Sequence, residues 1–176
     1  MDKLEMEKLK EMIRTIPDFP EKGVMFRDIT TALNDKDGLH AIIEDFTKRY
    51  KDQNIDYVLG ADARGFIFGA AIAYNIGAGF VPARKIGKLP GETISVEYDL
   101  EYGKNTIEVH TDAFKKDAKV LIVDDLLATG GTAGAMVKLV ELSGAKVYEL
   151  AFLIELEDLD GRKLLDGYDV YSILKY

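Results

Sequence analysis

The sequence predicts an α/β domain whose core is a mostly parallel, twisted sheet flanked by helices. Short apolar runs typical of strands alternate along the chain with longer segments of helical periodicity. The apolar run at residues 120–123 is continuous and rich in β-branched side chains, which is typical of a strand covered on both faces. This alternation defines the α/β class. A chain of 176 residues without a linker-like stretch predicts a single domain.

The elements follow in order from the N-terminus. Apolar side chains at helical spacing among charged ones predict helices over residues 3–14 and 37–50. Pro17 and Pro20 stop the first of these helices. From residue 57 onward, short apolar or alternating runs predict strands, and small or apolar residues at helical spacing predict the helices between them. The predicted strands are residues 57–60, 80–83, 105–110, 120–123, 147–154 and 168–174, and the predicted helices are 66–76 and 132–143.

Residues 85–102 interrupt this alternation. Pro90 and Gly91 exclude a long regular element there, although the segment carries aromatic, cationic and acidic side chains together. A long irregular segment inside a compact domain is more often functional than a plain connector. We therefore expect residues 86–104 to form a flexible lid.

Composition excludes several function classes. Twenty-three Lys and Arg against 31 Asp and Glu give a net charge of −8, which weighs against nucleic-acid and anionic-membrane partners. The chain has no cysteine, so disulfides, thiolate nucleophiles and cysteine-based metal sites are excluded. The first residues lack the apolar core of a signal peptide, and the longest apolar run, residues 66–76, is too short to span a bilayer. We expect a cytoplasmic protein that does not contact membranes.

The segment 120–132 carries the sharpest chemical signal. A predicted buried strand ends in Asp124 and Asp125, passes through a loop of small residues with two glycines, and opens a helix at Thr132. Glycines let backbone amides approach an anion, and the helix directs its unpaired N–H groups and positive dipole end to the same point. The two carboxylates lie at the edge of the sheet where open α/β folds bind ligands, and they can accept hydrogen bonds from ribose hydroxyls. The pattern predicts a loop that binds a 5′-phosphate, next to two acids that bind the ribose carrying that phosphate. The competing interpretation, a solvated Asp pair before a glycine turn, does not account for the agreement of strand, acids, loop and helix.

The sequence does not match other common phosphate-binding, metal-binding or hydrolase motifs. No segment has the glycine and lysine spacing of a P-loop, and Ser143 does not lie in a nucleophile elbow. Residues 33–44 imitate a calcium loop, but Leu33 occupies the obligatory first ligand position.

Taken together, the segments resemble a known family. Residues 120–132 resemble the signature of the type I phosphoribosyltransferases that binds phosphoribosyl pyrophosphate (PRPP). The rest of the chain is similar, nearly end to end, to the adenine-specific members of that family, with Phe-Arg-Asp-Ile, Ala-Arg-Gly-Phe and Leu-Glu-Tyr-Gly as the most specific matches. The matching segments are residues 16–20, 23–30, 63–69, 84–90, 100–103 and 167–170.

The resemblance implies both a fold and a reaction. It implies the type I phosphoribosyltransferase fold, with an N-terminal helix and adenine-binding hood over residues 1–35 and the lid over 86–104. The reaction would transfer the 5-phosphoribosyl group from PRPP to adenine, giving AMP and pyrophosphate in purine salvage. Mg²⁺ would act with PRPP, without a dedicated protein site but with Asp124 and Asp125 as its nearest candidates, and the protein would be a homodimer.

The resemblance also assigns residues to roles. Phosphate and ribose would contact Asp124, Asp125, Ala128, Thr129, Gly130, Gly131 and Thr132. Pyrophosphate would contact Ala63, Arg64, Arg84, Lys85 and Lys88, with a cis peptide bond between Asp62 and Ala63. Adenine would contact Met25, Phe26, Arg27 and Arg64. Glu101 and Arg84 would be the catalytic residues, and Tyr102 would close the lid over the site.

Simpler interpretations stay open for some of these residues. Lys85 and Lys88 are also consistent with solvated charges, Phe26 with ordinary core, and Arg27 with a structural ion pair to Asp28. Two other functions also stay open: transfer to hypoxanthine, guanine or xanthine, and non-catalytic PRPP binding by a transcriptional regulator. The net charge of −8 and the lack of an added helix-turn-helix domain argue against the regulator.

Overall fold

The computed structural model describes residues 1–99 and 103–176. It divides the chain into two compact units, residues 1–45 and residues 46–176, and each is described by itself.

The larger unit contains a seven-stranded sheet in the described residues, ordered β5-β6-β4-β3-β7-β8-β9. Five neighbouring strands, from β4 to β9, run parallel, whereas β6 pairs antiparallel with both β4 and β5. The predicted mostly parallel α/β class is therefore confirmed. The strands are β3 (Tyr57–Ala61), β4 (Gly79–Lys85), β5 (Thr93–Asp99), β6 (Lys104–His110), β7 (Lys119–Leu127), β8 (Lys146–Glu155) and β9 (Val170–Lys175).

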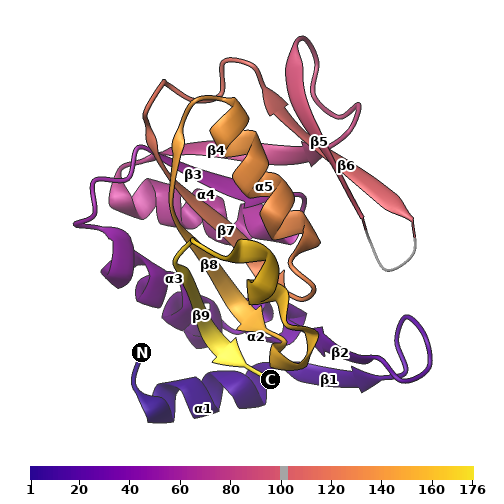
Figure 1. Ribbon diagram of the computed structural model, residues 1–176. Coiled ribbons are helices and arrows are strands. Elements are labelled where there is room, and N and C mark those ends of the chain that lie inside the picture. The colour runs from indigo at the N-terminus through magenta and orange to yellow at the C-terminus, as the bar shows by residue number, and fades with distance from the viewer. Residues whose placement is uncertain (100–102) are drawn as a thin grey trace. The chain divides into compact units, whose positions relative to one another are not determined.

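Helices cover both faces of this sheet. α4 (Arg64–Ile76) lies on one face and α5 (Gly131–Leu142) on the other, as Figure 1 shows. Residues 120–123 of the central strand β7 are wholly buried, as expected of a strand between two helical layers. The short helices η1 (Glu157–Leu159) and η2 (Gly161–Leu165) connect β8 to β9. β3 and β7 are neighbouring parallel strands, so the loops after them lie at the same edge of the sheet.

The strands and helices predicted beyond residue 57 all lie within a few residues of their expected bounds, but one expectation is wrong. Residues 93–99 are not irregular: they form β5, which makes an antiparallel hairpin with β6 (Figure 1). Pro90 and Gly91 lie in the turn before this strand. β5 is an edge strand in which only Val96 is buried, so its apolar signal is weak.

The smaller unit begins with α1 (Lys3–Met12), as the spacing predicts, and continues through β1 (Arg14–Pro17), β2 (Met25–Asp28) and α2 (Thr30–Asn34). β1 and β2 form an antiparallel hairpin, with Arg14 opposite Asp28. The sequence patterns did not predict β1, β2 or α2, because elements of four or five residues are too short to show a period. α3 (Lys36–Tyr50) begins in this unit and ends in the larger one.

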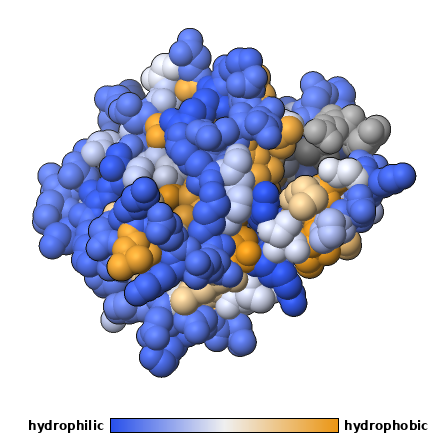
Figure 2. All heavy atoms as spheres, turned by 90° about the horizontal axis from the view of Figure 1, so that it is seen from below, coloured by the Kyte–Doolittle hydropathy of each residue, from blue (hydrophilic) through white to orange (hydrophobic). Residues whose placement is uncertain are grey.

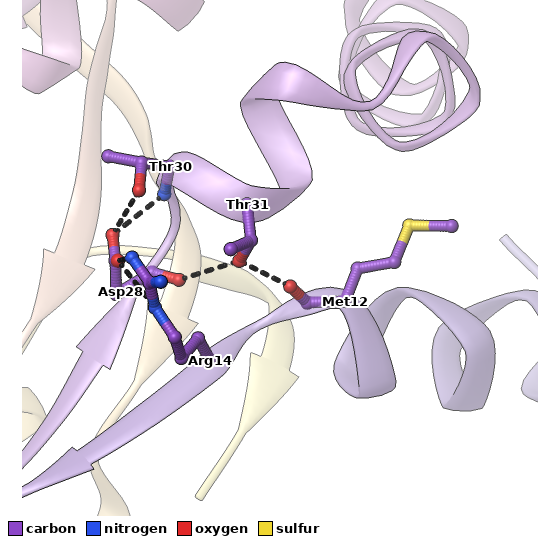
Figure 3. Close-up of polar contacts among 5 residues, drawn as sticks. All are labelled: Met12, Arg14, Asp28, Thr30 and Thr31. Carbon is purple, nitrogen blue, oxygen red and sulfur yellow. Dashed lines mark hydrogen bonds and ion pairs between the residues drawn. The ribbon is translucent and has the colours of Figure 1, made fainter.

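A buried carboxylate ties the smaller unit together (Figure 3). Asp28 accepts hydrogen bonds from the Thr30 backbone N–H at 2.9 Å and from its hydroxyl at 2.6 Å, and it pairs with the Arg14 guanidinium. The hydrogen bonds from Thr30, and then the one from Arg14, lower the pKa of Asp28 to about 2. The expected alternative of an Arg27–Asp28 ion pair is therefore wrong, since Arg14 is the partner; the Arg27 guanidinium donates to the Thr15 hydroxyl.

On the face of the molecule drawn in Figure 2, hydrophilic residues predominate and apolar residues form separate patches. Among the described residues, no helix has the length and apolar character needed to cross a membrane.

Candidate active site

A pocket of about 420 Å³ lies at the carboxyl edge of the parallel strands. It unites residues from the β3–α4 loop, the end of β4, the β5–β6 hairpin, β7 and the start of α5. Its lining residues are Ala61, Asp62, Ala63, Arg64, Lys85, Tyr98, Asn105, Ile107, Asp124, Asp125 and Thr132. Six of these residues, Ala63, Arg64, Lys85, Asp124, Asp125 and Thr132, were predicted from sequence as site residues.

The loop after β7 has the form expected of an anion site. β7 ends at Leu127 and α5 begins at Gly131, so Ala128, Thr129 and Gly130 form the connection. Gly130 adopts the left-handed conformation with φ 87°, which side chains disfavour. α5 is twelve residues long and presents its first N–H groups at this end. The pocket therefore opens beside a helix terminus suited to a phosphate.

A second glycine, Gly161, lies in close backbone contact with this loop. A Cβ atom on Gly130 would lie 2.4 Å from the carbonyl oxygen of Gly161, and a Cβ atom on Gly161 would lie 2.2 Å from the carbonyl oxygen of Ala128. Both distances are far below van der Waals contact, so the two backbones touch only because both residues are glycine. Sequence analysis missed Gly161, because a single glycine after an aspartate indicates only a turn.

The two acids of β7 differ in environment. Asp125 is buried and pairs with Arg64, with the guanidinium Nε 2.6 Å from the carboxylate. Burial raises the pKa of Asp125, and the Arg64 charge opposes that shift. Burial, and then repulsion from Asp125, raises the pKa of Asp124 well above its ordinary value. Gly65 permits this packing, because a Cβ there would lie 3.0 Å from the Asp124 carboxylate.

The β3–α4 loop also lines the pocket. The peptide bond between Asp62 and Ala63 is cis, as predicted. Arg84, at the end of β4, donates from Nε to the Asp62 carboxylate at 2.8 Å, and its guanidinium lies 5.9 Å from the Phe66 ring. The sequence did not predict the pairing of Asp62 with Arg84, because the two residues lie 22 positions apart.

The hairpin contributes a residue that the sequence did not single out as a ligand. The Tyr98 hydroxyl on β5 lies 3.2 Å from the Thr132 hydroxyl at the start of α5. Lys85 reaches the same pocket from β4, whereas Lys88 is exposed on the following turn and is not among the lining residues.

Three of the four predicted adenine-binding residues, Met25, Phe26 and Arg27, lie in the smaller unit, whereas Arg64 begins α4 of the larger one. Met25 is 51% exposed, and Phe26 is half-buried with its ring edge-on to Phe19 at 5.1 Å. Phe26 is therefore not ordinary core. The predicted acid/base Glu101 and the lid residue Tyr102 lie outside the described residues.

Asp124 and Asp125 are the residues of the pocket that could hold a magnesium ion. Within residues 1–99 and 103–176, no three carboxylates or histidines are grouped to enclose a metal. Asp124 and Asp125 both face the pocket, and Mg²⁺ commonly combines one or two carboxylates with substrate phosphates and water.

Known proteins are similar to this chain in sequence and in fold. The family model of the phosphoribosyl transferase domain matches residues 30–174. An adenine phosphoribosyltransferase of Clostridium botulinum is 58% identical over 96% of this chain and 98% of its own. The crystal structure of adenine phosphoribosyltransferase from Thermoanaerobacter pseudethanolicus has a TM-score of 0.94 at 53% identity, covering 97% of this chain and 99% of that one. The Saccharomyces cerevisiae enzyme, crystallised with an imino-altritol bisphosphate and adenine, has a TM-score of 0.92 at 36% identity, covering 97% and 98%.

The fold and the site thus define a phosphoribosyl transferase domain. This chain belongs to the adenine phosphoribosyltransferase family within that class.

Proposed function

We propose that this protein transfers the 5-phosphoribosyl group of PRPP to N9 of adenine, which gives AMP and pyrophosphate in purine salvage. The observation that carries the proposal is one pocket that joins the start of α5, two carboxylates and cationic side chains. These three groups suit the phosphate, the ribose hydroxyls and the pyrophosphate of one substrate. The adenine in the yeast relative's crystal structure supports the choice of base.

The loop Ala128–Gly131 and Thr132 hold the 5′-phosphate in this proposal. Backbone amides and the positive end of α5 meet the phosphate, while Asp124 and Asp125 accept hydrogen bonds from the ribose hydroxyls. The support is that Asp124, Asp125 and Thr132 line the same pocket.

Pyrophosphate is the leaving group, and the β3–α4 loop, the end of β4 and the turn after it hold it. Ala63, Arg64, Arg84, Lys85 and Lys88 are assigned to it. The transition state resembles an oxocarbenium ion, so the chain acts mainly by stabilising the departing charge and excluding water. Mg²⁺, when bound, would offset the negative charge of the pyrophosphate, with Asp124 and Asp125 as the residues that could hold it.

Adenine is assigned to Met25, Phe26, Arg27 and Arg64, with Phe26 stacking on the ring. Backbone groups at Met25 offer one donor and one acceptor, which suit N1 and the 6-amino group of adenine and mismatch a 6-oxopurine. Residues 1–35 are the proposed hood and 86–104 the proposed lid, in which Tyr102 covers the site and Glu101 exchanges a proton at purine N7. Glu101→Gln keeps the shape but removes titration, so we expect a ~10²–10⁴-fold lower kcat. A loss below about threefold, under 1 kcal/mol of barrier, would remove the acid/base role.

The proposal includes a homodimer in the cytoplasm. Ile67, Ala70 and Tyr74 follow one another at helical spacing on α4, and all three are exposed, with Tyr74 85% exposed. This apolar stripe is the surface that we assign to the second copy. Tyr74→Glu should shift the protein toward monomer in light scattering, and an unchanged mass would exclude this surface.

The function is tested by measuring AMP formation from PRPP with each purine base, with and without Mg²⁺. We expect turnover with adenine only, dependent on Mg²⁺. Turnover of hypoxanthine, guanine or xanthine instead would assign another base, and PRPP binding without any turnover would identify a regulator.

A further inference from the structure

Glu108, in the middle of β6, is a buried carboxylate that the proposed reaction does not use. Its residue is 3% exposed. Side chains alternate along a strand, so Glu108 and the pocket-lining Ile107 point to opposite faces of the sheet. Glu108 therefore does not line the pocket and does not reach the substrate directly.

The two carboxylate oxygens of Glu108 hold different segments. Oε1 accepts hydrogen bonds from the backbone N–H groups of Lys88 and Leu89, both at 3.2 Å. Oε2 accepts a hydrogen bond from the Thr93 hydroxyl at 3.0 Å. One side chain on β6 thus binds the turn between β4 and β5 and also the first residue of β5.

These donors hold the carboxylate in its charged form. Burial by itself would raise the pKa of Glu108, but hydrogen bonds from the Leu89 amide, the Thr93 hydroxyl and the Lys88 amide lower it below its ordinary value. A buried anion without such donors would be strongly disfavoured. The turn and the carboxylate consequently stabilise each other.

The turn itself carries little that would fix its shape. Gly87 and Gly91 have φ of 76° and 85°, and a Cβ on either would meet nothing within 4 Å. Lys85 and Lys88 bracket the first half of this turn, and the Lys88 N–H also donates to the Lys85 carbonyl at 3.2 Å. Lys85 is held by the pairing of β4 with β6, opposite Ile107, so the path of the turn determines the direction of the Lys88 side chain.

We propose that Glu108 is a positioning residue for the leaving group: by binding the Lys88 and Leu89 amides, it sets the turn so that Lys88 joins Lys85 in facing the pyrophosphate of PRPP. The inference rests on the proposed function. A carboxylate suits this task because both of its oxygens are acceptors, so Glu108 accepts from the two amides and from the Thr93 hydroxyl at once.

The test compares three substitutions of Glu108 in the full chain. Glu108→Ala removes every acceptor, so we expect the KM for PRPP to rise about tenfold, as for lost hydrogen bonds to a charged group, with kcat changed less than about threefold. Glu108→Gln can still accept from both amides and donate to Thr93, so it should restore most of the affinity. Glu108→Asp keeps the charge but shortens the reach, and its KM should lie between those of Ala and wild type.

Coupling to Lys88 separates positioning from general stability. If Glu108 acts through the turn, Glu108→Ala in a Lys88→Ala background should raise the KM for PRPP much less than it does alone. Glu149→Gln is the matched control, because Glu149 is also buried but pairs with Arg49. It should lower the melting temperature and leave the KM for PRPP unchanged.

The outcomes distinguish this inference from the proposed function. If wild-type protein forms AMP and Lys88→Ala raises the KM for PRPP, but folded Glu108→Ala and Glu108→Asp stay within about twofold of wild type, then only the inference fails. Full additivity of the two alanine substitutions overturns it as well. Should Glu108→Ala not fold, Glu108→Asp decides alone. Absence of AMP formation by wild-type protein would reject the function itself.

Discussion

The two sides of the pocket are held in place by different means. On the parallel half of the sheet, the loop after β7 rests backbone against backbone on Gly161, and no side chain can be inserted between them. On the antiparallel half, the turn after β4 is held by a side chain, the Glu108 carboxylate. The first arrangement fixes backbone amides for a phosphate, whereas the second leaves two flexible lysine side chains to be adjusted. We therefore expect substitutions in the loop after β7 to cause large losses of activity with PRPP, and substitutions in the turn after β4 to cause smaller ones.

Gly130→Ala should have the largest effect. The new Cβ would require a left-handed residue that is not glycine, which costs ~1–2 kcal/mol, and it would lie 2.4 Å from the Gly161 carbonyl oxygen. Displacement of the loop amides should lower kcat/KM for PRPP by ~100-fold or more, as for misplaced anion donors. Steady-state kinetics at saturating adenine measure this loss.

Gly134→Ala and Gly161→Ala complete this prediction. Gly134 lies in α5, where a Cβ would meet nothing closer than 4.0 Å, so alanine should be neutral or stabilise by ~0.5–1 kcal/mol. Gly161→Ala should act like Gly130→Ala, since its Cβ would lie 2.2 Å from the Ala128 carbonyl oxygen. Normal PRPP kinetics in both Gly130→Ala and Gly161→Ala would show that this backbone contact does not fix the loop.

The same difference explains what the sequence could predict. The segment 120–132 was predictable because each part is local: the buried run, the two acids, the glycines and the helix all follow within thirteen residues. Its support by Gly161 was not predictable, because that contact joins residues about thirty positions apart.

The antiparallel half was harder to predict. Glu108 occupies a polar position in a strand expected to alternate between core and solvent, yet it is buried because the β4–β5 turn and Thr93 cover it. β5 was mistaken for an irregular segment because Pro90 and Gly91 precede it and one buried residue gives no clear period. Arg84 was assigned to substrate by resemblance, and its partner Asp62 emerged only in three dimensions.

Asp124→Asn should have the second largest effect. Asp124 lines the pocket, and loss of its charged acceptor should lower kcat/KM for PRPP by ~10- to 100-fold with the fold intact. Burial and Asp125 raise the pKa of Asp124, so the charged form that accepts from ribose is gained as pH rises. Wild-type kcat/KM should therefore increase with pH through this raised pKa.

The variant should lose that acidic limb of the pH profile. The limb belongs to the coupled pair Asp124 and Asp125, so its midpoint is an apparent value. Unchanged kinetics and an unchanged profile in Asp124→Asn would remove it from the ribose role.

Lys88→Ala should have a smaller and graded effect. An exposed lysine on a flexible side chain contributes one charge to the pyrophosphate, so the KM for PRPP should rise ~5-fold and the defect should shrink at high salt. Lys116→Ala is the control, because this exposed lysine precedes β7 at the amino edge of the parallel strands. Equal effects of the two substitutions would mean that only net charge matters, and not the turn.

The smallest effect is expected at Asp28, the second carboxylate that fixes a backbone segment. Hydrogen bonds from Thr30 and Arg14 lower the pKa of Asp28 from 3.8 to about 2, so the charged form stabilises the fold. This stabilisation is complete above 3.8, the ordinary value, and is lost as pH falls through about 2. Arg14 is 58% exposed, which limits the contribution to about 1 kcal/mol. In urea unfolding, Asp28→Asn should be less stable than wild type by that amount near neutral pH, and the difference should disappear in strong acid.

Asp52→Asn, at an exposed position, should match wild type at every pH. A difference between wild type and Asp28→Asn that stays constant down to the most acidic condition would mean that Asp28 acts through its shape and not through its charge. Asp28 would then act as the glycines of the phosphate loop do, through the space it occupies, and not as Glu108 does, through its charged oxygens.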